Sequence, residues 1–96
     1  MAKASWNGEV LAESNEVEKI QGMVFFPARS VKMQYLRMSN NTDTCPWGGK
    51  VSYFDVIVGR EINNDGAMIY IEPSENALHL KDHIAFRRGI TVEEDQ

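Results

Sequence analysis

The stretch from residue 42 to residue 54, T-D-T-C-P-W-G-G-K-V-S-Y-F, holds the residues best suited to chemistry. It contains the single cysteine, Cys45, together with Trp47 and a Gly48-Gly49 pair that leads into a β-branched and aromatic run. A thiolate at Cys45 would act as a nucleophile or redox group if a cation or a helix N-terminus lowered its pKa. Free cysteine is also among the most buried residue types, so the alternative is a small side chain packed under the turn.

Three residues elsewhere in the sequence are candidates for that cation: Lys50, His79 and His83. A lone histidine is more often a surface residue than a base. Lys81-Asp82 also interrupts any helix that would place both histidines on one face. We therefore assign no catalytic residue, and Cys45 stays the only candidate for that role.

The aromatic residues favour a binding site. Tyrosine and tryptophan combine an apolar ring with a polar tip, which is typical of residues that line a concave ligand site. The same rings would serve equally well as core, and Phe86 is interpreted as a core residue. The predicted ligand-binding residues are Thr44, Cys45, Trp47, Lys50, Tyr53 and Tyr70.

Composition argues against several other functions. One cysteine and two histidines do not make a Cys-rich zinc site, so we predict neither a metal nor a cofactor. The net charge is −4, and Glu93, Glu94 and Asp95 supply −3 of it, which leaves −1 for residues 1–92. A nearly neutral body lacks the clustered Lys and Arg that bind phosphates, so we expect no nucleic-acid partner.

The apolar runs are much shorter than the roughly 20 residues that cross a bilayer, so we expect no membrane partner. Residues 1–15 lack the basic start and apolar stretch of a signal peptide. A single cysteine also agrees with a reducing compartment. Together these features predict a cytoplasmic protein.

Turn signals divide the 96 residues into short strands. Asn7-Gly8 and Gln21-Gly22 each predict a two-residue hairpin turn. Residues 50–60 carry apolar side chains in both alternating sets, which predicts a central strand covered on both faces. The run N-N-D-G at 63–66 predicts a turn, after which residues 67–71 return antiparallel.

Two short helical segments are expected between the strands. Ser30 is predicted to cap a helical turn over residues 31–36, and Ser74 a helix over residues 75–80. The polar residues 39–43 are predicted to be a connector without regular structure.

The whole pattern predicts a mainly β fold, with one compact domain over residues 1–92 and one or two short helices. Residues 83–87 are expected to form its last strand, and residues 93–96 an acidic, frayed tail. Exposed edge strands are able to pair two chains, so a homodimer is compatible with the sequence.

Four segments, 6–14, 24–31, 42–54 and 83–89, have the order and spacing of one family. They read W-N-G-E-V-L-A-E-S, V-F-F-P-A-R-S-V, T-D-T-C-P-W-G-G-K-V-S-Y-F and H-I-A-F-R-R-G. Through them the chain resembles the bacterial domain of unknown function family 427 from residue 4 to residue 92.

The resemblance implies a small domain with a strongly bent antiparallel sheet, like the β-tent of methionine-R-sulfoxide reductases, and it implies no assigned activity. Those reductases carry paired cysteines for zinc, which this chain lacks. Members of the family usually have Lys where Gly48 stands and Trp where Met68 stands, so any ligand contact made there is lost or changed.

Three functions remain open from the sequence. The first is the binding of a small molecule or peptide in a cleft beside the Cys-Pro-Trp-Gly-Gly turn. The second is a cysteine-dependent enzyme, redox or hydrolytic, that uses Cys45. The third is a structural or oligomerisation module without a ligand.

Overall fold

The computed structural model describes residues 1–94, which form strands joined by turns and short 3-10 segments. The strands are β1 (Ala2–Trp6), β2 (Glu9–Ser14), β3 (Glu18–Ile20), β4 (Met23–Pro27), β5 (Leu36–Cys45), β6 (Gly49–Val58), β7 (Glu61–Pro73), β8 (His83–Phe86) and β9 (Thr91–Glu94). The 3-10 segments are η1 (Ala28–Ser30), η2 (Met33–Tyr35) and η3 (Glu75–Leu80).

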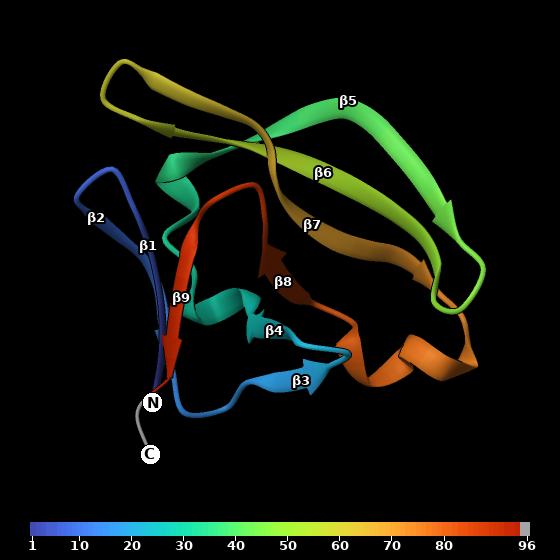
Figure 1. Cartoon of the computed structure of the whole chain (residues 1–96). Helices are drawn as coiled ribbons and strands as arrows, with labels where there is room; N and C mark the ends of the chain where they lie inside the picture. The colour runs from blue at the N-terminus through green and yellow to red at the C-terminus, as the bar shows by residue number, and fades with distance from the viewer. Residues whose placement is uncertain (95–96) are drawn as a thin grey trace.

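The strands form two antiparallel sheets, one in the order β2-β1-β9 and one in the order β3-β4-β8-β7-β6-β5 (Figure 1). The radius of gyration is 12.5 Å, which is the value expected for a compact domain of this length. The prediction of a mainly β, single compact domain is confirmed. The β-tent shape implied by the resemblance stays a prediction.

Two of the predicted turns have the backbone that their residues favour. Asn7 and Gly8 have φ angles of 53° and 83°, and Gln21 and Gly22 have φ angles of 51° and 82°. Two successive positive φ angles define the type I′ turn, whose twist matches that of a hairpin. Asn7-Gly8 joins β1 to β2, and Gln21-Gly22 joins β3 to β4.

The alternation of side chains along β6 separates two apolar clusters. The strand lies between β5 and β7, as predicted for a central strand. Phe54, Val56 and Val58 face a cluster shared by both sheets, in which the rings of Phe26 and Phe86 lie 5.8 Å apart. On the other face, Val51 and Tyr53 contact a second cluster, which η3 covers with Ala77 and Leu80.

The predicted turn at residues 63–66 is wrong, because this run lies inside β7. The chain reverses instead at Gly59-Arg60, and Gly59 has a φ angle of 60°. Asp65 has a φ angle of 55°, where the β6–β7 register shifts, and its N–H donates to Asp55 Oδ1 at 3.0 Å. Residues that tolerate positive φ therefore form a β-bulge here.

The predicted connector at residues 39–43 is also wrong, since these residues belong to the edge strand β5. An edge strand exposed to water tolerates the polar side chains that suggested a loop. Ser74 is the N-cap residue of η3 over residues 75–80, as predicted, but its side chain makes no cap bond because Ser74 Oγ donates to the Trp47 carbonyl at 2.9 Å. The predicted Ser30 cap is wrong, since Ser30 is the last residue of η1 and its Oγ donates to the Pro27 carbonyl at 2.7 Å.

Residues 83–87 were predicted to hold the last strand, but β9 follows and pairs with β1. Glu93 and Glu94, expected in a frayed tail, lie in β9 opposite Lys3 and Ala2. The rest of that tail, residues 95–96, lies outside the described residues. Among residues 1–94, no helical segment has the length and apolar character needed to span a bilayer.

Candidate functional site

A half-open hollow of about 240 Å³ lies on the face of the six-stranded sheet that carries Val51 and Tyr53. It is lined by Gln21, Met23, Asp43, Thr44, Cys45, Val51, Tyr53, Met68 and Tyr70. The first two come from the β3–β4 hairpin and the next three from the end of β5. Three strands separate β4 from β5 in the sheet order, so the sheet must curve for both to border one hollow.

The floor of the hollow consists of two cross-strand pairs. Val51 of β6 lies opposite Tyr70 of β7, and Tyr53 lies opposite Met68. The Tyr70 ring stacks on Phe25 at 6.1 Å, and Trp47 meets it edge-on at 6.4 Å. These contacts hold Tyr70 nine-tenths buried while its hydroxyl reaches the rim.

The turn from Cys45 to Gly49 is fixed by its neighbours. A Cβ on Gly48 would lie 2.5 Å from the Tyr70 ring. Gly49 has a φ angle of 101°, and a Cβ there would overlap the Glu72 carbonyl oxygen. At Gly49 only glycine allows the close approach, because the neighbouring atoms are backbone, whereas at Gly48 the neighbour is the Tyr70 side chain.

The segment η3 is bonded to the same turn. The Trp47 carbonyl accepts hydrogen bonds from Ser74 Oγ at 2.9 Å and from Asn76 Nδ2 at 3.0 Å. The Ser74 N–H also donates to the Gly48 carbonyl at 2.8 Å. The turn, η3 and Tyr70 therefore form one rigid end of the hollow.

The Cys45 thiol lies at this end, 3.8 Å from the Tyr70 hydroxyl oxygen, which donates to it. A hydrogen bond from the Gly48 backbone lowers the pKa of Cys45, and bonds from the Tyr70 hydroxyl and the Trp47 backbone lower it further. Burial raises the pKa of Tyr70 to about 12, and the hydrogen bond to Cys45 and the charges of Cys45 and Tyr53 contribute in the same direction. Tyr70 therefore stays protonated at neutral pH and stabilises the thiolate.

We expect the substitution Tyr70→Phe to raise the pKa of Cys45, because the thiolate loses a donor. The rate of alkylation by iodoacetamide should then rise at a higher pH than in the unmodified protein. Tyr53→Phe is the control, since Tyr53 borders the hollow without a hydrogen bond to the thiol among the described contacts. Equal alkylation profiles for both variants and the parent would show that the Tyr70 hydroxyl does not act on the sulfur.

The structure brings four of the six predicted ligand-binding residues to the hollow: Thr44, Cys45, Tyr53 and Tyr70. Trp47 lies behind Tyr70 and does not line it. Lys50 is exposed, and because it precedes Val51 on β6 its side chain projects from the opposite face. Neither His79 nor His83 borders the hollow.

Sequence reasoning missed five residues of the lining: Gln21, Met23, Asp43, Val51 and Met68. Val51 and Met68 lie two residues from the predicted Tyr53 and Tyr70, so the period of two along a strand could have found them. Gln21 and Met23 carried no such signal, because only the curvature of the sheet brings their hairpin to β5.

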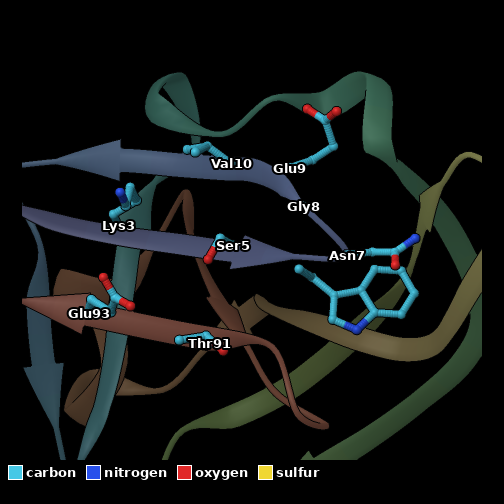
Figure 2. A pocket seen from close by; sticks show the side chains of 9 residues that line it. Lys3, Ser5, Asn7, Gly8, Glu9, Val10, Thr91 and Glu93 are labelled. Carbon is cyan, nitrogen blue, oxygen red and sulfur yellow. The ribbon is translucent and has the colours of Figure 1, made fainter.

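A second hollow, of about 380 Å³, lies on the three-stranded sheet (Figure 2). Its lining is mostly polar, and Lys3 and Glu93 lie opposite each other across β1 and β9. Figure 2 shows Ser5 and Thr91 between these charges and the Asn7-Gly8 turn. Although larger, it lacks an apolar floor on which a ligand could bury surface, so the first hollow is the better candidate.

Within residues 1–94, no group of three or more His, Cys, Asp or Glu side chains is placed to hold a metal ion. The residues of the site thus carry one thiol, two phenols, one exposed carboxylate, one amide and one hydroxyl around an apolar floor.

Fold and site together define a small antiparallel β domain with an apolar hollow beside a free thiol. Residues 1–95 match the family described as Domain of unknown function (DUF427), and the chain belongs to this family. A search of curated proteins gave no match.

Proposed function

We propose that this domain binds a small molecule, or one side chain of a peptide, in the hollow beside Cys45. The observation that supports this function is the floor of Val51, Tyr53, Met68 and Tyr70, an apolar surface left half-open between two rims. Polar groups at Asp43 and Gln21 stand on those rims, as expected where a few hydrogen bonds orient an apolar ligand.

The size of the hollow limits the ligand. Pockets for drug-sized ligands measure roughly 300–1,000 Å³, and this one measures about 240 Å³. A single ring with a short chain fits that volume, whereas a dinucleotide does not. We also propose a cytoplasmic location, since a thiol with a lowered pKa is preserved in a reducing compartment.

A cysteine-dependent enzyme is the second candidate, and the lowered pKa of Cys45 favours it. The thiolate borders the hollow, so a bound electrophile would lie within its reach. Among the described residues, however, no histidine and no second cysteine borders the hollow. Binding therefore explains more of the site than catalysis does.

The substitution Met68→Trp tests the binding function, because a larger side chain at this half-buried position would fill the hollow. A library of single-ring fragments is titrated into the 15N-labelled protein. We expect some fragments to shift the amide signals of Val51 and Tyr53, and Met68→Trp to abolish these shifts. Met38→Trp is the control, since Met38 is 65 % exposed on the edge strand β5.

Two results would contradict the proposal. One is a library in which no fragment shifts the signals around the hollow, and the other is binding that Met68→Trp leaves unchanged. The first result would favour a structural module without a ligand.

A further inference from the structure

We propose that the ligand of this hollow carries an oxyanion, a carboxylate or a phosphate monoester, which the guanidinium of Arg87 binds. The inference rests on the proposed function and names the chemical class of its ligand. The guanidinium carbon of Arg87 lies 4.8 Å from the centroid of the Tyr53 ring, over its face. Tyr53 belongs to the floor of the hollow, so the cation lies next to that floor, although Arg87 itself is not one of the lining residues.

The backbone fixes Arg87 on this side of the sheet. Ala85 of β8 lies opposite Met68, and the alternation of side chains places Arg87 on the same face as Ala85. The Arg87 N–H donates to the Gly66 carbonyl at 2.8 Å, which continues the β7–β8 pairing past Phe86. The side chain is half-buried, and its cation–π contact with Tyr53 holds the guanidinium in one place.

Arg87 has no ion-pair partner among the described residues 1–94, although it lies near one carboxylate. A hydrogen bond from Ser39 lowers the pKa of Asp65, and the charges of Arg88 and Arg87 lower it further. In the part of the chain that the structure describes, no carboxylate oxygen lies within 4.0 Å of its guanidinium. Arg37, by contrast, reaches the carboxylate of Asp55 at 3.1 Å. Stacking on a ring leaves the edge of a guanidinium free, and that edge binds oxyanions with two parallel hydrogen bonds.

The charges around the hollow determine how an anionic ligand is oriented in it. Asp43 and Cys45 lie at the rim formed by β5, where the Asp43 carboxylate repels an anion and the Cys45 sulfur does so when it is ionised. Along β6, the distance from Gly49, which is opposite Cys45, to Tyr53 is about 13 Å at ~3.3 Å per residue. An anionic group at Arg87 therefore leaves room for an apolar body over Val51 and Met68.

The test compares three probes that share a phenyl ring: 3-phenylpropanoate, phenyl phosphate and the neutral 3-phenylpropanamide. Each is titrated into the 15N-labelled protein at low salt, and the dissociation constant is taken from the amide shifts of Val51 and Tyr53. We expect at least one of the two anions to bind roughly tenfold more tightly than the amide, because a charge-assisted bond is added. The anion that binds more tightly than the amide shows whether the oxyanion of the ligand is a carboxylate or a phosphate monoester.

Arg87→Gln should remove the preference for the anion over the amide. Arg88→Gln is the control: it changes the net charge by the same amount at an exposed neighbouring residue, and it should keep the preference. Arg87→Lys keeps the charge but loses the planar fork, so it should bind the anions with intermediate strength. If Arg87→Gln does not fold, the inference can be tested on the unmodified protein. Added salt should then weaken the binding of the anions and leave the binding of the amide unchanged.

Each other outcome overturns the inference. If the amide binds at the hollow as tightly as the anions, or if both glutamine variants weaken the anions equally, the oxyanion inference is wrong and the proposed binding function stands. If no probe and no fragment of the library shifts the signals of the hollow, both are wrong.

Discussion

Replacing Gly49 with alanine is expected to lower the free energy of unfolding by about 3–4 kcal/mol. Part of this loss comes from the positive φ angle of 101°, which a residue with a Cβ adopts at a cost. The larger part comes from contact, because the new methyl group would overlap the Glu72 carbonyl and lie 2.9 Å from the Ser74 nitrogen. Both are backbone atoms, so a side-chain rotation cannot relieve the overlap.

Urea denaturation followed by tryptophan fluorescence measures the loss, and Gly8→Ala is its control. Gly8 also has a positive φ angle, 83°, but a Cβ there would meet no heavy atom within 4 Å. Gly8→Ala should therefore lose only the conformational part, roughly 1–2 kcal/mol. Equal losses for the two variants would show that the turn yields to the added methyl group and that the close approach is not a constraint.

Leu80→Ala is also expected to have a large effect, lowering the free energy of unfolding by about 2–5 kcal/mol. Leu80 is fully buried at the end of η3, in the cluster that contains Phe25 and Tyr70. The substitution leaves a cavity in the cluster to which Tyr70 belongs, so it should also loosen the rigid end of the hollow. We expect the alkylation of Cys45 to change along with stability.

Leu78→Ala makes a matched control, since Leu78 is the same residue type in the same segment and is 57 % exposed. Its loss should stay within about 0.5 kcal/mol. The difference between the two variants in denaturant midpoint gives the contribution of burial. A similar loss at both positions would mean that η3 is not anchored by Leu80.

Local turn chemistry made part of this fold predictable. Asn-Gly and Gln-Gly tolerate two successive positive φ angles, and the structure uses both pairs in hairpins. The same tolerance led to the wrong prediction of a turn at residues 63–66, because a β-bulge favours the same residue types as a turn. Residue preference reports the backbone angle at a position and does not distinguish a reversal from a bulge.

Only those site residues that lie on the neighbouring strands β5, β6 and β7 were predictable from the sequence. Cys45 and Tyr53 belong to one hairpin, β5–β6, and Tyr70 pairs with that hairpin from β7, so a local pattern located all three. Met23 and Arg87 come from other parts of the sequence. Their positions depend on the strand order of the six-stranded sheet and on its curvature, which long-range pairing decides.

The pairing of β9 with β1, in which Ala2 lies opposite Glu94, has a consequence for folding kinetics. Closing a loop of about 90 residues costs more entropy than closing a hairpin, so this contact is expected to form late. The β6–β7 hairpin, which carries the floor of the hollow, needs only local closure and is expected to form early. The floor of the hollow would then form before the three-stranded sheet is complete.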